Sequence, residues 1–253
     1  MREEWITSRK NPLLVQIRRL ASSRGARRSA GMFLGDGVKL LEEALKWGAP
    51  LETVVYSEGL DGPELPPEVR TVRVPEDVMA SISPMESPQG ALFLCRTGET
   101  APPERLPGER YLVLDGLQDP GNVGTIWRTA DALEADGLLL VHGCADPFGP
   151  KVVRATMGAC FRLPVWETGP ERLAGLLERS GLALYATALR EDTEDIKTAD
   201  LSRSAVVIGS EGRGVSPELL AMSQRALKIP MRERCESLNA AAAAAVVLWE
   251  MGR

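Results

Sequence analysis

Apolar and polar positions follow two patterns along the first 96 residues. Short, continuous apolar runs bounded by Gly, Pro or polar residues predict buried strands, and apolar residues spaced three or four positions apart predict amphipathic helices. The runs fall at 31–35, 51–57, 69–74 and 91–95, and the helical spacing falls at 11–23 and 36–47. This alternation predicts a small α/β/α domain.

A stretch without apolar periodicity follows at 97–109, TGETAPPERLPGE. Its prolines and glycines are typical of a connection, not of a helix or strand. The pattern therefore predicts a domain at 1–96, a linker at 97–109 and a second domain at 110–253.

Strand and helix patterns alternate more regularly after the linker. Strands are predicted at 111–117, 137–141, 182–187, 205–209 and 226–230, and helices at 125–133, 170–180, 217–223 and 238–251. Continuous apolar strands separated by helices imply a parallel sheet that is covered on both faces. Ligands of such sheets bind in the loops after the strands, so we expect the functional site there.

Composition narrows the class of protein. The 253 residues are 44% hydrophobic and 26% charged, as in folded globular chains. The longest apolar run, 240–249, is half the roughly 20 residues of a membrane span, and no signal peptide precedes it, so we expect a cytoplasmic protein. The cysteines, Cys95, Cys144, Cys160 and Cys235, are far apart with only His142 as a companion, and we expect no metal site.

Charge is distributed unevenly. Residues 1–28 hold eight Arg or Lys residues against two Glu, a local charge of +6 in a chain of net charge −5. A concentrated positive segment suits an anionic polymer, because phosphate contacts release counterions. The alternative is a solvated helix face. The candidate RNA-binding residues are Arg9, Lys10, Arg18, Arg19, Arg27, Arg28 and, further along the chain, Arg154.

The first candidate loop, 115–128, reads DGLQDPGNVGTIWR. It is predicted to turn through its glycines and enter a helix near Thr125, which places Arg128 in the first turn. A cation there is unfavourable for the helix dipole unless it receives an anion, such as a phosphate bound by free N–H groups. Asn122 offers a donor and an acceptor to a nucleotide. The alternative is a glycine-rich turn followed by a surface arginine.

Two further loops carry candidate chemistry. In 208–215, IGSEGRGV, three glycines allow close approach of the backbone to a ligand, and Glu211 is either a functional carboxylate or a solvated charge. Ser216 and Pro217 then predict a helix start. Residues 229–231, IPM, precede 237–240, SLNA, where Ser237 is interpreted as an N-cap and Asn239 as a first-turn residue that helix propensity does not favour.

Taken together, NVGTIWR, IGSEGRGV and IPM followed by SLN resemble the motifs of the SpoU-type, or TrmH-type, RNA ribose 2′-O-methyltransferases of the SPOUT superfamily. The resemblance covers most of 111–253, and SRKNPLL, GDGVKLLEEAL and SPQG are similar to the ribosomal-protein-like RNA-binding domain that often precedes it. It implies a deep trefoil knot, S-adenosylmethionine as cofactor, an RNA substrate, most simply ribosomal RNA, and a homodimer with the site near the subunit interface.

The resemblance also assigns roles by position. The catalytic and RNA-positioning residues implied are Asn122, Arg128, Glu211, Ser237 and Asn239, and the cofactor-binding residues implied are Thr187, Gly209, Ile229, Met231 and Leu238. A guanidinium rarely gives up its proton, so we interpret Arg128 as a phosphate clamp that stabilises the developing alkoxide.

Three alternatives stay open. The first is an RNA-binding protein with this fold but no catalysis, and the second is a methyltransferase of transfer RNA or one that confers antibiotic resistance. The third is a nicotinamide-dependent oxidoreductase, which only the strand and helix alternation suggests, because the glycine fingerprint of that class is missing.

Overall fold

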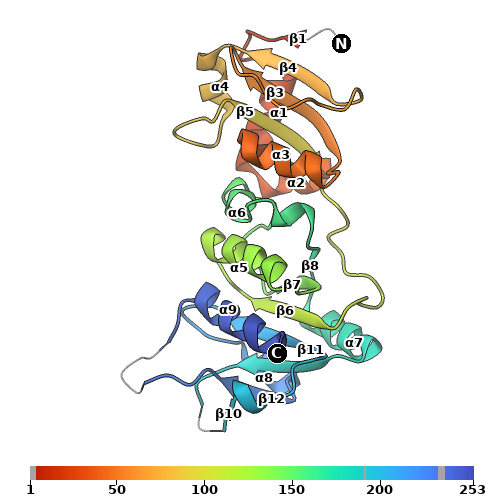
Figure 1. Cartoon of the computed structure of the whole chain (residues 1–253), viewed down its shortest axis with the longest axis vertical. Coiled ribbons are helices and arrows are strands. Elements are labelled where there is room, and N and C mark those ends of the chain that lie inside the picture. The colour runs from red at the N-terminus through yellow and green to blue at the C-terminus, as the bar shows by residue number, and fades with distance from the viewer. Residues whose placement is uncertain (1–3, 191, 233–236) are drawn as a thin grey trace. The chain divides into compact units, whose positions relative to one another are not determined.

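A computed structural model describes residues 4–190, 192–232 and 237–253 (Figure 1). Arg2 and Cys235 lie outside these residues. The chain divides into two units, each with its own core. The N-terminal unit comprises Met1–Gly98 and Phe148–Phe161, and the C-terminal unit comprises Glu99–Pro147 and Arg162–Arg253. The sequence assigned 148–161 to the second domain, whereas the structure packs this segment with the first.

The N-terminal unit is built on a five-stranded mixed sheet in the order β1-β4-β3-β5-β2. The strands are β1 (Glu4–Trp5), β2 (Met32–Asp36), β3 (Leu51–Ser57), β4 (Arg70–Val74) and β5 (Ala91–Arg96). Strands β1, β4 and β3 are parallel, while β5 is antiparallel to both β3 and β2. The longer strands thus confirm the apolar runs predicted from the sequence.

Helices cover both faces of this sheet, as the α/β/α prediction requires. The helices of this unit are α1 (Pro12–Ser22), α2 (Arg24–Ala30), α3 (Val38–Lys46), α4 (Glu76–Ile82) and α6 (Pro150–Ala155), with a 3₁₀ turn, η1 (Ala159–Phe161). Leu92 and Leu94 of β5 pack in one core with α1 and α4, and Phe93 and Cys95 pack in the other with α3. The alternation follows from side chains pointing to opposite faces of a strand.

Three phenylalanines explain why 148–161 packs with the N-terminal unit. The Phe33 ring lies 5.2 Å from that of Phe148 and 6.2 Å from that of Phe161, measured between ring centroids. Val153 of α6 joins the same core. Aromatic contacts of this kind bury a large apolar area, so this segment is anchored by the β2 side of the sheet.

The C-terminal unit is a seven-stranded sheet in the order β10-β12-β9-β11-β6-β7-β8, and all its pairings are parallel. Its strands are β6 (Arg110–Asp115), β7 (Gly137–Val141), β8 (Val165–Glu167), β9 (Ala183–Thr187), β10 (Glu194–Asp195), β11 (Ser204–Gly209) and β12 (Arg225–Lys228). The predicted parallel sheet is confirmed. Strand order reverses where β6 pairs with both β7 and β11, and ligands bind beyond the strand ends at such a point.

Helices cover both faces of the seven-stranded sheet. They are α5 (Pro120–Ala132), α7 (Pro170–Ser180), α8 (Pro217–Met222) and α9 (Ala240–Met251), with a 3₁₀ turn, η2 (Ile196–Thr198). Helices α7 and α8 contribute to one core with Ala205 and Val207 of β11. Helices α5 and α9 pack together, and α9 packs on β11 from the opposite face (Figure 1). None of the helices described is long and apolar enough to cross a membrane.

The segment predicted as a linker is tied to the C-terminal unit over its second part. Leu106 is 3% exposed and its N–H donates to Ser180 Oγ at 2.9 Å. The carbonyls of Pro102 and Glu104 accept from arginines of α7. These bonds hold residues 99–109 along α7, so this stretch packs against the C-terminal unit.

Candidate functional site

An apolar cavity of about 270 Å³ opens beyond the carboxyl end of β11. The five positions implied for cofactor binding all line it: Thr187, Gly209, Ile229, Met231 and Leu238. Sequence reasoning missed other lining residues, among them Leu189, Leu227 and Ala243. Leu189 lies two residues after β9 and is 59% exposed, and the sequence alone does not distinguish such a leucine from a core leucine.

The loop that forms one wall of this cavity is a tight hairpin. Ser210 N donates to Gly214 O at 3.1 Å, and Gly214 N donates to Ser210 O at 2.8 Å. A Cβ at Gly209 would overlap the backbone of Gly214 and Val215, and Gly214 itself has φ of +67°. Gly209 is therefore required by the close return of the chain, whereas a Cβ at Gly212 would meet nothing within 4 Å.

Three polar residues from distant parts of the chain meet at the mouth of the cavity. The Asn239 Nδ2 donates to Asn122 Oδ1 at 3.1 Å, and the Asn122 Nδ2 donates to Glu211 Oε1. Asn239 precedes α9, Asn122 belongs to α5 and Glu211 lies on the hairpin. The structure thus brings together three of the residues implied to be catalytic.

Asn239 is the N-cap of α9. Its Oδ1 accepts from Ala241 N at 2.9 Å and from Ala242 N at 3.4 Å. The interpretation of Ser237 as the N-cap is therefore wrong, because the helix begins at Ala240. Ser237 instead lines the apolar cavity. Capping holds the Asn239 side chain in place and leaves its Nδ2 free to donate to Asn122.

Helix α5 starts earlier than the sequence predicted. Asp119 is its N-cap, with Oδ1 accepting from Asn122 N at 2.7 Å, and Pro120 occupies the first helical position. Asn122 is thus in the first turn, and Arg128 lies two turns further on. Arg128 therefore does not lie beside the free N–H groups of the first turn, so the prediction that placed it there is wrong. Arg128 is exposed, and its guanidinium makes no hydrogen bond or ion pair with any residue that the structure describes.

The candidate RNA-binding cations lie on the N-terminal unit, and one of them is not available. Arg27 is only 7% exposed, and its guanidinium donates to the Leu20 carbonyl at the end of α1. Burial of this arginine contradicts its proposed contact with RNA. The exposed or half-buried members that remain are Arg9, Lys10, Arg18, Arg19, Arg28 and Arg154. Several of them lie on α1 and α2, so the positive segment is helical.

The cavity suits S-adenosylmethionine by its chemistry. Apolar side chains such as Ile229 and Leu238 match an adenine ring, while backbone groups of the hairpin offer donors and acceptors for its polar edge. The absence of a Cβ at Gly209 keeps the hairpin closed beside this space. In the described part of the chain, no group of three or more His, Cys, Asp or Glu residues is arranged to hold a metal ion.

Comparisons with known proteins match both parts of the chain to RNA methyltransferases and their substrate-binding domain. The SpoU rRNA methylase family model matches residues 109–249, and the MRM3-like substrate binding domain matches residues 11–92. An uncharacterized tRNA/rRNA methyltransferase of Synechocystis is 36% identical and covers 98% of this chain and 93% of its own. The 23S rRNA (guanosine(2553)-2′-O)-methyltransferase of Bacillus subtilis is 32% identical, and the match covers 97% of this chain and 98% of that protein.

A solved structure shares the fold along nearly its full length. The AdoMet-bound rRNA methyltransferase from Sinorhizobium meliloti superimposes with a TM-score of 0.84 at 31% identity, over 98% of this chain and 97% of that one. The ordered motifs, the parallel sheet and the cavity agree with these matches. The chain belongs to the SpoU rRNA methylase family.

Proposed function

We propose that this protein transfers the methyl group of S-adenosylmethionine to a ribose 2′-hydroxyl of ribosomal RNA. The observation that carries the proposal is the Asn122, Glu211 and Asn239 network at the mouth of the apolar cavity. A relative of the same length is named as a 23S rRNA 2′-O-methyltransferase, and a structural neighbour is named as AdoMet-bound.

The cofactor would be held by Thr187, Gly209, Ile229, Met231 and Leu238, which line the cavity. When bound, it supplies a methyl group on a positively charged sulfur. A ribose hydroxyl is a weak nucleophile near neutral pH, so orientation and loss of its proton are the tasks left to the protein.

The chain's own residues divide these tasks. Glu211 fixes the Asn122 amide, and Asn122 in turn fixes Asn239. Ser237, at the cavity wall, and the two asparagines shape the surroundings of the incoming hydroxyl. Arg128 contributes by binding a phosphate and stabilising the developing alkoxide, not by accepting the proton, because a guanidinium is a hydrogen-bond donor without an acceptor atom.

We also propose a homodimer and the deep knot of the family. Trp249 is 63% exposed on α9, and Ala242 and Val246 share its helical stripe, a surface that a second copy would cover. Residues 208–212 line one cavity together with Ile229, Met231 and Leu238 although helix α8 and strand β12 separate them along the chain, which supports a knotted path. Sedimentation of the purified protein tests the dimer, and a monomer that still methylates RNA would refute it.

Binding of RNA falls to the N-terminal unit in this proposal, which matches a substrate-binding domain. Its cations would contact phosphates, and RNA is recognised largely through shape, phosphates and ribose hydroxyls. We propose the cytoplasm as the site of action. Among the described residues, Cys95, Cys144 and Cys160 form no disulfide with one another, as expected in a reducing compartment.

The decisive experiment incubates the protein with ribosomal RNA from cells that lack it, using a labelled methyl donor, and maps the labelled nucleotide. We expect one 2′-O-methylated ribose in ribosomal RNA. Methyl transfer to tRNA alone would show that tRNA, and not ribosomal RNA, is the substrate. Calorimetry separates the non-catalytic alternative, because a protein that only binds RNA has no need to bind S-adenosylmethionine.

A further inference from the structure

His142 is the one histidine of the sequence, and its backbone is strained. It follows β7 directly with φ of +54°, in the left-handed region that disfavours side chains. Glycine would adopt this conformation without a penalty. A non-glycine residue persists in such a conformation when its surroundings hold it, and an outlier of this kind points to a role for the side chain.

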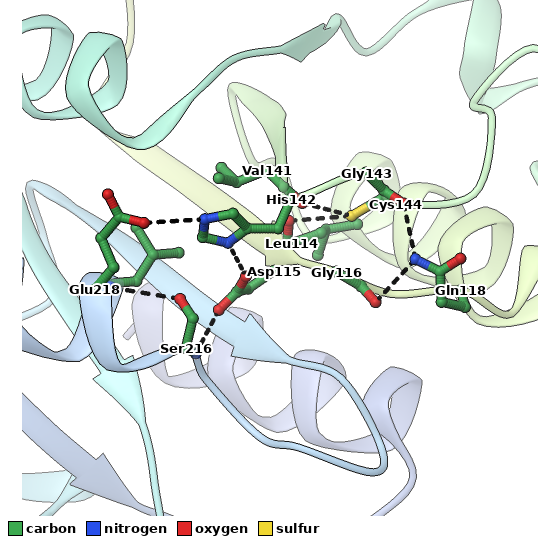
Figure 2. A network of polar contacts seen from close by, with 11 residues as sticks. Leu114, Asp115, Gly116, Gln118, Val141, His142, Gly143, Cys144, Ser216 and Glu218 are labelled. Carbon is green, nitrogen blue, oxygen red and sulfur yellow. Dashed lines mark hydrogen bonds and ion pairs between the residues drawn. The ribbon is translucent and has the colours of Figure 1, made fainter.

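The imidazole of His142 bridges two carboxylates (Figure 2). Its Nδ1 lies 2.6 Å from Asp115 Oδ1, and its Nε2 lies 3.2 Å from Glu218 Oε2. An ionised carboxylate can only accept hydrogen bonds, so both ring nitrogens must carry protons for the bridge to be complete. The hydrogen bond to Asp115 raises the pKa of His142 from its ordinary 6.5, and the charges of Asp115 and Glu218 act in the same direction.

Asp115 connects this bridge to the hairpin. Its side chain is 3% exposed, and Oδ2 accepts from the Ser216 N–H at 2.6 Å. Ser216, which is bonded to Asp115 in Figure 2, ends the segment that begins after β11. Gly209, just before that segment, pairs with Asp115 across the sheet. Asp115 therefore contacts the chain at both ends of segment 210–216, through Gly209 on one side and Ser216 on the other.

We propose that Asp115, His142 and Glu218 form a clamp that positions segment 210–216, and with it Glu211, for the methyl transfer. The inference rests on the proposed function. These are positioning residues, because none of the three lines the apolar cavity and they act through the hairpin. Asp115 and His142 line a second cavity of about 720 Å³ beside the hairpin, where the other charged groups are Glu211 and Arg213.

The clamp has a defined dependence on pH. The pKa of His142 is raised in the folded protein. Both hydrogen bonds of the imidazole are therefore present below the ordinary pKa of 6.5, and one is lost as pH rises through the raised pKa of His142. Neutral imidazole has a single N–H and can donate to one carboxylate only, which leaves its other nitrogen facing a like acceptor. The hairpin should therefore loosen on the alkaline side.

The first test compares two variants that relieve the same backbone strain. His142→Gly removes the bridge, whereas Glu134→Gly acts at an exposed residue with φ of +58° after α5. We expect His142→Gly to speed hydrogen exchange of amides 212–216 and to lower kcat/KM, each by about tenfold, the effect of losing a charged hydrogen bond. Glu134→Gly should change neither. Equal behaviour of the two variants would overturn the clamp.

The second test changes the pH response without removing the contact. In Glu218→Gln, the amide can donate to the unprotonated Nε2, so neutral His142 keeps both partners. Because the chain has one histidine, its imidazole proton signals in NMR report the pKa directly. We expect wild type to titrate above 6.5 and Glu218→Gln to titrate lower, with a flatter alkaline limb of kcat/KM. An identical alkaline loss in both proteins would refute the proposal.

The two readouts separate this proposal from the proposed function. Hydrogen exchange and NMR need neither RNA nor cofactor. If the variants differ in exchange but wild type methylates no ribosomal RNA, the proposed function fails and the clamp stands. If wild type methylates RNA and His142→Gly matches Glu134→Gly in exchange and in kcat/KM, the clamp alone is refuted.

Discussion

The two units carry the candidate function in different ways. In the N-terminal unit, the candidate residues other than the buried Arg27 are solvent-accessible cations on helices or in the turn before α1, and ion pairs such as the one between Arg9 and Asp77 remain open to solvent. In the C-terminal unit, Asn122, Glu211 and Asn239 contact one another beside a cavity, and a helix cap and the hairpin position them. The first arrangement tolerates small displacements, and the second does not.

This difference follows from what each unit would do. Attraction of a phosphate by an exposed arginine is long-ranged and weakly dependent on angle, so surface positions suffice. Transfer of a methyl group needs atoms held within fractions of an ångström, and hydrogen bonds among Asn122, Glu211 and Asn239 hold these side chains although Glu211 and Asn239 are exposed. We therefore expect substitutions in the C-terminal unit to reduce the rate, and substitutions in the N-terminal unit to reduce affinity.

The largest effect should come from the amide of Asn239. Asn239→Asp keeps an oxygen to cap α9 but loses the donor to Asn122. We expect kcat to fall by about 100-fold, in the range found when one positioned donor is removed. The melting temperature should stay near that of wild type. Asn239→Ala is the companion variant, since it should lose both the rate and about 1 kcal/mol of capping. A normal kcat in Asn239→Asp would contradict the proposed role.

The next effect concerns the hairpin. Gly209→Ala introduces a Cβ that overlaps the Gly214 backbone, so we expect a loss of about 1–3 kcal/mol in the free energy of unfolding and weaker binding of S-adenosylmethionine. Gly212→Ala is the matched control, because its Cβ meets open space. Denaturant unfolding and calorimetry measure both quantities. Similar results for the two variants would show that the close return of the chain is unimportant.

A smaller effect is expected in the N-terminal unit. Changing Arg18, Arg19 and Arg28 to Gln should leave kcat unchanged and reduce the slope of log affinity for RNA against log salt by about 2, given roughly 0.7 per phosphate contact. Arg27→Gln is the control, because that buried guanidinium donates to Leu20 O and should affect stability but not the slope. An unchanged slope in the triple variant would remove these arginines from the RNA interface.

The smallest effect concerns the reactivity of cysteines in the cores of the two units. Burial raises the pKa of Cys95 to about 12 and that of Cys144 to about 11, so both thiols stay protonated at pH 8. Alkylation followed by peptide mass mapping should label Cys160, which is half-buried, faster than either. Rapid labelling of Cys144 alone would show that the core of the C-terminal unit opens more readily than that of the N-terminal unit.

Local patterns in the sequence were enough for the longer strands and for most helices, whereas the short strands β1, β8 and β10 and the helices α4 and α6 were not predicted. Apolar runs are continuous because strands such as β5 and β7 are buried on both faces, and this property is visible in a few neighbouring residues. The start of α5 was mispredicted because Gly121 and Gly124 favour a turn, while the cap at Asp119 favours a helix. Helix α2, RGARRSA, has no apolar stripe and was not predicted at all.

The sequence by itself determined the parallel sheet, the order of the motifs and the family, because these depend on residue type and spacing along the chain. Only the tertiary structure decided which side chains meet. Asn122 and Asn239 are 117 positions apart, Asp115 and Ser216 are 101 apart, and the burial of Arg27 depends on how α1 and α2 pack. Such contacts arise when distant strands pair and align their carboxyl ends, and no local window of sequence contains that information.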